Sequence, residues 1–275
     1  MSLHDVPTTP APERRGLRRG VFLLPSLFTV ANLFCGWACV VYAMRGEFHT
    51  AAPFIGFAVV LDMLDGRIAR MTGSSSAFGV EFDSMADLIS FGMAPAALTF
   101  QWGLQPLGRL GWAVGFLYLA AAAVRLARFN IQHVTDKRYF VGMPSPSAAG
   151  VPAATIFFVG DGLTERGPAL LALVMLVVPA LLMVSTFRFR SMKTMNLSSP
   201  VNSKVLIVVA AAIALFTTSP DVVLLVLAYG YLVSPIIEWA TTRGSRRPAP
   251  AAASAQALVD TPPADAPAGP AHPER

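Results

Sequence analysis

Charged residues are scarce in this chain of 275 residues: they make up 13% of the sequence, about half the share of a typical soluble domain. Apolar residues make up 54%, and the mean hydropathy is +0.56. The composition excludes an ordinary soluble enzyme and a disordered chain, and the long apolar runs predict several membrane spans. The net charge of +5 does not favour nucleic-acid binding, because the Lys and Arg residues lie between the apolar runs.

Cysteine is almost absent. The two cysteines, Cys35 and Cys39, lie four residues apart in one apolar run. On a helix this spacing puts their β-carbons about 5–6 Å apart, whereas a disulfide needs about 3.5–4.5 Å. We therefore expect two buried thiols and no bridge between them.

The apolar runs predict an all-α fold, a polytopic integral membrane helical bundle. A helix needs roughly 20 residues to cross the hydrocarbon core. Eight runs meet or approach this length, at residues 22–44, 49–70, 82–101, 109–129, 147–161, 168–187, 203–218 and 221–241. We expect residues 21–243 to form the membrane domain, flanked by a basic arm at 1–20. The tail at 244–275 is rich in Pro and Ala and has no aromatic residue, so we expect it to be disordered.

The positions of the basic residues predict the orientation of the spans. With eight spans and both termini in the cytoplasm, 18 of the 21 Lys and Arg residues lie on the cytoplasmic side. The outer side keeps only Arg45, Arg109 and Arg166. This asymmetry is the one that the positive-inside rule requires.

Four aspartates are concentrated at one end of the second and third predicted spans. Asp62 and Asp65 are three residues apart, and Asp83 and Asp87 are four apart, so each pair shares one helix face. The connection between the two helices is short, which predicts antiparallel neighbours with converging carboxylates. Charged groups inside a membrane are costly and by default indicate function.

Four carboxylates in a small space require a cation among them. Oxygen ligands without a nearby His or Cys favour Mg²⁺, Mn²⁺ or Ca²⁺, and Mg²⁺ sites of this kind usually hold substrate phosphates too. Two ions, or one ion and a catalytic base, suit four carboxylates. Gly66, Ala69 and Gly79 leave room for a bulky ligand, and Arg70 can contact a phosphate oxygen.

The complete spacing runs unbroken from Asp62 to Asp87. It reads Asp-x-x-Asp-Gly-x-x-Ala-Arg, then eight residues, Gly, three residues, Asp, three residues and Asp. This pattern resembles the signature of the CDP-alcohol phosphatidyltransferase family. Pro25, Thr29 and Asn32 resemble the family's entry segment, with Ser26 in place of the usual Asn. The resemblance covers roughly residues 20–240.

The resemblance implies an enzyme that transfers the phosphatidyl group of CDP-diacylglycerol to an alcohol and releases CMP. It implies Mg²⁺ or Mn²⁺, as two ions, held by the four aspartates, with Asp87 also acting as the base on the acceptor hydroxyl. The residues implied to contact the CDP-lipid are Gly66, Ala69, Arg70, Ser76, Gly79, Pro25, Thr29 and Asn32.

Two later segments resemble the phosphatidylserine synthase branch of the family. They are Arg125-Leu-Ala-Arg128-Phe-Asn130 and Gly142-Met-Pro-Ser145-Pro-Ser. L-serine is therefore the expected acceptor, with Arg125, Arg128, Asn130 and Ser145 as acceptor-binding candidates. Two arginines one turn apart would suit the serine carboxylate, but they would equally suit a phosphorylated acceptor or serve as membrane anchors.

Other functions remain open at this point. The same chemistry could use glycerol 3-phosphate, inositol phosphate or choline, and aspartates could also line a cation transporter. A transporter would spread its carboxylates along several helices, whereas here all four lie at one end of one pair. The resemblance also implies a homodimer, and the orientation places the active site at the cytoplasmic face of a bacterial-type inner or plasma membrane.

Overall fold

The computed structural model describes residues 15–72, 76–131, 139–185, 188–190 and 203–243. The chain divides into two compact units, Met1–Pro235 and Ile236–Arg275. The predicted tail at 244–275 and most of the predicted arm lie outside the described residues. The first helix begins at Arg15, so residues 15–20 of the predicted arm are helical.

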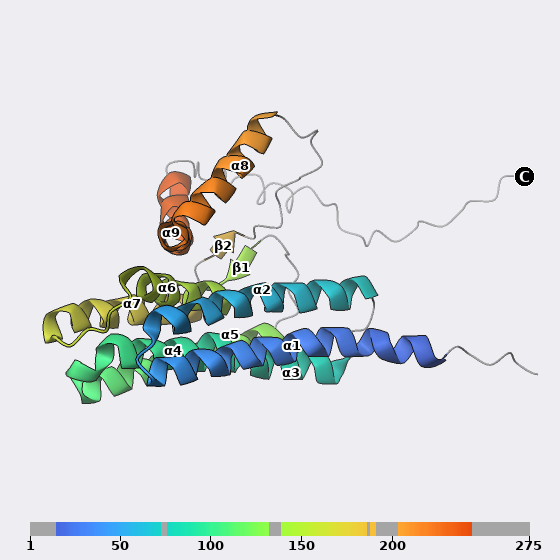
Figure 1. Cartoon of the computed structure of the whole chain (residues 1–275), viewed down its shortest axis with the longest axis horizontal. Coiled ribbons are helices and arrows are strands. Elements are labelled where there is room, and N and C mark those ends of the chain that lie inside the picture. Colours follow the sequence, from blue (N-terminus) through green and yellow to red (C-terminus); the bar gives the residue numbers. More distant parts are fainter. Residues whose placement is uncertain (1–14, 73–75, 132–138, 186–187, 191–202, 244–275) are drawn as a thin grey trace, which may run out of the picture. The chain divides into compact units, whose positions relative to one another are not determined.

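Helices dominate the described part of the chain, as the apolar runs predicted (Figure 1). The separate helices are α1 (Arg15–Met44), α2 (Phe48–Thr72), α5 (Arg109–Ile131), α6 (Ser145–Val159), α7 (Arg166–Val184), α8 (Ser203–Thr218) and α9 (Pro220–Arg243). Gly46 adopts φ +76° in the turn between α1 and α2, a conformation that favours glycine.

The third predicted span is one long helical stretch with changes of pitch. It consists of α3 (Ala77–Asp87), the π-helix η1 (Leu88–Met93), α4 (Ala94–Thr99), the π-helix η2 (Phe100–Leu104) and the 3₁₀ turn η3 (Gln105–Leu107). A π-helical turn accommodates an extra residue and often lies at a functional site. Here the first one begins directly after Asp87.

Two short strands were not predicted from the sequence. β1 (Tyr139–Val141) pairs antiparallel with β2 (Arg188–Arg190). Gly142 follows β1 with φ +80°, and a β-carbon there would lie 2.5 Å from the carbonyl oxygen of Met183. Only glycine fits this close approach, which brings the start of α6 against the end of α7.

α1 packs against both α2 and α3, while α2 contacts the continuation of the third helix at η1 and α4 (Figure 1). The sequence predicted that α2 and α3 are direct neighbours. Carboxylate oxygens of Asp62 on α2 and of Asp83 and Asp87 on α3 lie within 4.8 Å of one another, so the two helices face each other there, and both also pack on α1. The carboxylate-bearing faces are therefore assembled around α1.

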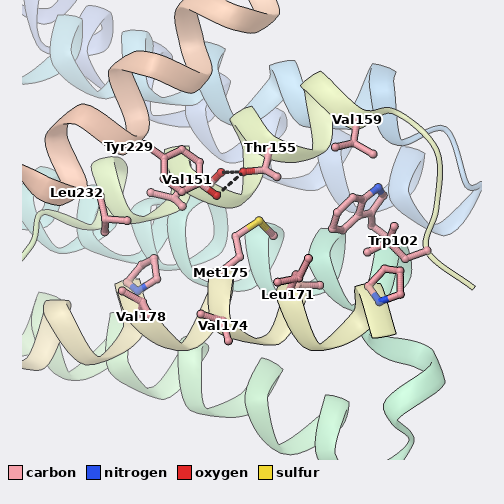
Figure 2. Close-up of a pocket in the computed structure, with 14 residues that line it drawn as sticks. Trp102, Val151, Thr155, Val159, Leu171, Val174, Met175, Val178, Tyr229 and Leu232 are labelled. Atoms are coloured by element: carbon pink, nitrogen blue, oxygen red, sulfur yellow. Dashed lines mark hydrogen bonds between the residues drawn. The ribbon is translucent and has the colours of Figure 1, made fainter. Parts of the chain in front are cut away.

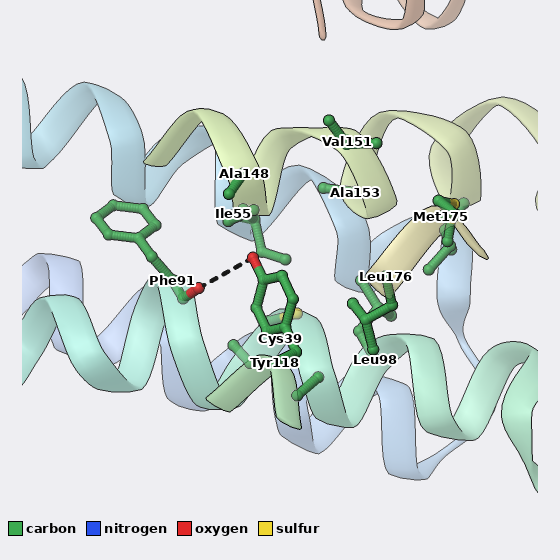
Figure 3. Close-up of a cluster of buried hydrophobic side chains, with 14 of the residues drawn as sticks. Cys39, Ile55, Phe91, Leu98, Tyr118, Ala148, Val151, Ala153, Met175 and Leu176 are labelled. Atoms are coloured by element: carbon green, nitrogen blue, oxygen red, sulfur yellow. Dashed lines mark hydrogen bonds between the residues drawn. The ribbon is translucent and has the colours of Figure 1, made fainter. Parts of the chain in front are cut away.

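The apolar core lies among α1, α2, α5, α6, α7 and the third helix (Figure 3). Tyr118 is its largest fully buried side chain, and its hydroxyl donates to the carbonyl oxygen of Phe91 at 3.3 Å. Small residues such as Ala148 let the helices approach closely. Cys35 and Cys39 are buried here as free thiols.

A second apolar region is a pocket of about 470 Å³ lined mainly by α6 and α7 (Figure 2). The hydroxyls of Thr155 and Tyr229 hydrogen-bond to each other at its edge, at 3.0 Å. Trp102 contributes from η2. The pocket lining has no acidic or basic side chain, so its surface suits hydrocarbon rather than a charged ligand.

Three helical segments of the described chain are long and apolar enough to cross a membrane, namely Ser26–Met44, Arg109–Ile131 and Arg166–Val184. Their outward side chains are apolar too: Trp112 and Leu171, for example, are about three-quarters exposed. Exposed apolar surface of this extent is unfavourable in water and favourable in lipid. The chain is an integral membrane protein, and the count of eight spans stays a prediction.

Candidate active site

The candidate site is built from the end of α2, the body of α3 and the facing side of α1. Asp62 and Asp65 lie on α2, and Asp83 and Asp87 lie on α3. Ser76 caps α3, because its hydroxyl accepts the backbone N–H of Gly79 at 3.0 Å. The cap starts α3 at a point from which both of its aspartates fall on one face.

The structure brings the four carboxylates together. Asp62, Asp83 and Asp87 each offer one carboxylate oxygen, and these three atoms all lie within 4.8 Å of one another. Asp65 is only 3% exposed and lies beside Asp83. We call these four residues the carboxylate cluster.

Two polar residues of α1 bind the carboxylate cluster directly. The Thr29 hydroxyl donates to Oδ2 of Asp65 at 3.3 Å, and the Asn32 amide donates to Oδ1 of Asp87 at 3.0 Å. Both α1 residues are buried. The resemblance implied that they contact the CDP-lipid; the structure gives each of them a hydrogen bond that orients an aspartate.

The π-helical turn after Asp87 fits closely against α1. The Ser90 hydroxyl donates to the carbonyl oxygen of Asn32 at 2.9 Å. A β-carbon on Gly36 would lie 2.7 Å from Ser90 Oγ and 2.9 Å from its α-carbon. Sequence analysis missed Gly36 and Ser90, because neither belongs to a motif and they meet only through the packing of α1 on η1.

The carboxylate cluster has the donor chemistry for a hard divalent cation. Oδ1 of Asp83 and Oδ1 of Asn32 are buried and have no hydrogen-bond partner. Buried carboxylates and unpartnered buried oxygens are costly unless a positive charge compensates them. The residues present therefore fit a bound Mg²⁺ or Mn²⁺.

The remaining candidates for CDP-lipid binding flank the carboxylate cluster. The Arg70 guanidinium lies near Gly66, where an added β-carbon would be 3.5 Å from its Nη1. Arg70 and Ser76 are exposed, whereas Gly66, Ala69 and Gly79 are half-buried. A small residue at Gly66 thus leaves the Arg70 side chain room beside the cluster. The side chain of Pro25 lies outside the described residues.

The four acceptor candidates separate into different surroundings. Arg125 Nη1 donates to the Ser145 hydroxyl at 2.7 Å, which joins α5 to the start of α6. Arg128 Nη1 instead donates to the carbonyl oxygen of Val184 at the end of α7, at 3.0 Å. Asn130 donates to the hydroxyl of Ser84 at 2.9 Å and so links α5 to α3.

Comparison with known proteins decides the family. A family model described as CDP-alcohol phosphatidyltransferase matches residues 22–216. The chain belongs to this family. Enzymes of the family generally depend on a divalent metal, and the carboxylate cluster provides suitable ligands.

Several relatives within the CDP-alcohol phosphatidyltransferase family carry the same name, CDP-diacylglycerol–serine O-phosphatidyltransferase. The Helicobacter pylori protein is 36% identical over 225 residues, which cover 80% of this chain and 92% of the relative. The Mycobacterium tuberculosis protein is 32% identical over 227 residues, 78% of each chain. The Bacillus subtilis protein is 34% identical over 125 residues, 46% of this chain and 70% of the relative.

Proposed function

We propose that this membrane enzyme transfers the phosphatidyl group of CDP-diacylglycerol to L-serine, giving phosphatidylserine and CMP. The observation that carries the proposal is the carboxylate cluster, three of whose oxygens lie within 4.8 Å of one another on the family's motif. The choice of serine is supported by the names of the relatives, which match this chain over most of its length.

Asp62, Asp65, Asp83 and Asp87 would hold Mg²⁺ or Mn²⁺, and four carboxylates suit two ions. Bound metal would neutralise the diphosphate and the leaving CMP. The protein's own part is to keep the carboxylates converged, which Thr29 and Asn32 support through their hydrogen bonds to Asp65 and Asp87. Such outer partners of metal ligands commonly affect metal affinity strongly.

In the proposed reaction, the serine hydroxyl oxygen forms a bond to the phosphorus that carries diacylglycerol. The bond between that phosphorus and the bridging oxygen of the diphosphate breaks, and CMP leaves with the electron pair. Asp87 takes the hydroxyl proton. Asn32 engages Oδ1 of Asp87, and the proposal assigns the acceptor proton to the second oxygen.

The CDP moiety would bind beside the carboxylate cluster. Gly66, Ala69 and Gly79 would let the nucleotide approach the backbone, and Arg70 and Ser76 would contact its polar groups. The proposal adds Pro25, Thr29 and Asn32 along α1. Arg70 is exposed, so its guanidinium is available to a diphosphate.

The proposal extends to the setting of the enzyme. Eight spans with both termini in the cytoplasm would place the carboxylate cluster at the cytoplasmic face of a bacterial-type inner or plasma membrane, where the nucleotide head of CDP-diacylglycerol and cytoplasmic serine can both reach it. Residues 21–243 would form the catalytic domain, flanked by the arm at 1–20 and the tail at 244–275. The enzyme would act as a homodimer.

A test of the acceptor is CMP release by the purified protein in mixed micelles of detergent and CDP-diacylglycerol with Mg²⁺ or Mn²⁺. Serine, glycerol 3-phosphate, inositol phosphate and choline are compared, and the lipid product is identified by mass. We expect phosphatidylserine from serine alone. Release of CMP with glycerol 3-phosphate and none with serine would refute the proposed acceptor while keeping the family chemistry.

A further inference from the structure

Asn32 on α1 makes two hydrogen bonds to the helical stretch that carries Asp87. Its side-chain amide donates to Oδ1 of Asp87 at 3.0 Å, and its backbone carbonyl oxygen accepts the Ser90 hydroxyl at 2.9 Å. Asn32 and Ser90 are both fully buried. Asn32 therefore connects the carboxylate of Asp87 with the π-helical turn that follows it.

The Ser90 hydroxyl is used differently from other hydroxyls in the described helices. Those of Ser84 and Thr99, for example, donate to the backbone carbonyl four residues earlier in their own helix, a common arrangement for serine and threonine inside a helix. Ser90 instead donates across 58 positions to α1. Its hydrogen bond is therefore a tertiary constraint that the local structure of η1 does not require.

The turn η1 is confined on two sides. On the α1 side, Gly36 allows so close an approach that an added β-carbon would lie 2.9 Å from the α-carbon of Ser90. On the α5 side, the Tyr118 hydroxyl donates to the carbonyl oxygen of Phe91 at 3.3 Å (Figure 3). These contacts fix the distance of η1 from α1, and Asp87 lies directly before η1.

The position of Asp87 matters because the proposed proton transfer needs its free oxygen within hydrogen-bond reach of the acceptor hydroxyl. Misplacing a catalytic group by about 1 Å can lower the rate by about a hundredfold. Thr29, one turn earlier on α1, binds Asp65 of α2 instead. Separate residues of α1 thus hold the two halves of the carboxylate cluster, and the contact at Ser90 affects the half that includes Asp87.

We propose that Ser90 is a positioning residue for Asp87 and acts through Asn32. The Ser90 hydroxyl fixes the backbone of Asn32, and the Asn32 amide then holds Asp87 in the orientation that lets it take the acceptor proton. The role requires no contact between Ser90 and either substrate. This inference rests on the proposed function, in which Asp87 is the base, and deepens it by naming the residue that sets the position of that base.

The test compares Ser90→Ala in the wild-type chain with Ser90→Ala in Asn32→Ala. The Asn32→Ala background keeps the backbone carbonyl that Ser90 binds and removes the amide that reaches Asp87. CMP release with L-serine and CDP-diacylglycerol at saturating Mg²⁺ or Mn²⁺ gives kcat per folded molecule and the KM values. Thermal unfolding in detergent gives the stability of each variant.

In the wild-type chain, Ser90→Ala should lower kcat by about 5- to 50-fold, with both KM values within about twofold. In Asn32→Ala, the same change should alter kcat by less than about twofold, because the connection to Asp87 is already broken. The midpoint of thermal unfolding should fall by about 2–4 °C in both backgrounds, as for the loss of one hydrogen bond.

Thr99→Val is the matched control. Thr99 is also fully buried, and its hydroxyl also bonds to a backbone carbonyl, but within its own helix. The substitution should lower the unfolding midpoint by a similar amount and leave kcat near the wild-type value. If Ser90→Ala or Asn32→Ala is not recovered folded, Ser90→Cys, with its weaker donor, and Asn32→Ser, with its shorter side chain, carry the same comparison.

Two results would overturn the role of Ser90 and leave the transfer to serine intact. One is an unchanged kcat in Ser90→Ala with a lowered unfolding midpoint, as in Thr99→Val, which would make the hydrogen bond purely structural. The other is an equal loss of kcat in both backgrounds, which would mean that Ser90 does not act through Asn32. Wild-type protein that releases no CMP with serine would instead overturn the proposed function itself.

Discussion

The carboxylate cluster and the apolar core are neighbours on the same helices, yet their polar groups differ in whether the protein itself supplies a hydrogen-bond partner. In the core, Tyr118 is fully buried and its hydroxyl bonds to the carbonyl oxygen of Phe91 (Figure 3). In the cluster, Asp83 and Asn32 each keep a buried oxygen without a partner.

The contrast distinguishes residues that stabilise the fold from residues that need a bound cation or substrate. Packing and internal hydrogen bonds stabilise the core without any ligand. The carboxylate cluster concentrates like charges that only a cation or a substrate can compensate. One polar atom near the apolar pocket, Trp102 Nε1, also lacks a partner among the described residues, but no charged group lines that pocket (Figure 2).

Changes in the carboxylate cluster should therefore reduce catalysis, and changes in the core should reduce stability. The largest effect on turnover is expected for Asp87→Asn, which keeps the size and one oxygen but removes the basicity. Turnover should fall by about 10²–10⁴-fold if general-base catalysis is lost. CMP release measures it, while calorimetry should still detect CDP-diacylglycerol binding with Mg²⁺ or Mn²⁺.

The matched control for Asp87→Asn is Asp161→Asn, the same change on an exposed aspartate after α6. It should leave turnover near the wild-type value. Near-native turnover in Asp87→Asn would mean that Asp87 is not the base, and the proton would need another acceptor.

The next largest effect is expected for Asp83→Asn, which should lower the affinity for the metal ion. It alters a carboxylate whose Oδ1 has no protein partner, so its expected ligand is the ion. The metal concentration for half-maximal turnover should rise by at least about tenfold, the lower end of the loss seen even for outer partners of metal ligands. A metal titration of CMP release measures this, and an unchanged midpoint would remove Asp83 from the ligand set.

Gly36→Ala should affect both regions, because Gly36 is where α1 approaches the turn that follows Asp87. The new β-carbon would lie 2.9 Å from the α-carbon of Ser90, so the helices must separate. Displacement of Asn32 and Asp87 by about 1 Å can lower turnover by up to about a hundredfold. Thermal stability should fall in the same variant. Gly56→Ala, with open space around it, is the control and should change neither quantity.

Leu98→Ala should lower the stability of the protein and leave its turnover unchanged. Leu98 is fully buried in the core on α4, and loss of a buried Leu side chain costs about 2–5 kcal/mol. A thermal-unfolding assay in detergent should show the loss, while turnover per folded molecule and the metal midpoint should match the wild type. A changed metal midpoint would show that the two regions are not energetically separate.

Truncation after Arg243 should have the smallest effect. The removed residues, 244–275, are rich in Pro and Ala, with no aromatic side chain to pack on the catalytic domain. Turnover and thermal stability should both stay within about twofold and a few degrees of the full chain. A large loss of turnover would mean that the tail docks on the domain.

Local sequence determined the positions of the helices, the faces on which the aspartates lie, and the family. Each of the eight apolar runs contains a helix, since backbone groups in lipid must be satisfied within the segment. The spacing of Asp62 with Asp65, and of Asp83 with Asp87, placed each pair on one helix face, because helical periodicity is a local property. The family also followed from that spacing.

Tertiary structure decided what joins residues far apart in the chain. Thr29 meets Asp65 across 36 positions and Asn32 meets Asp87 across 55, and no periodicity encodes such pairs. The π-helical turn after Asp87 packs closely on α1 at Gly36, a contact between residues more than 50 positions apart. Two arginines with the same local pattern, Arg125 and Arg128, received different partners because α6 and α7 approach α5 at different points. Sequence determines which face a side chain occupies, whereas the rotation and packing of whole helices determine what that face meets.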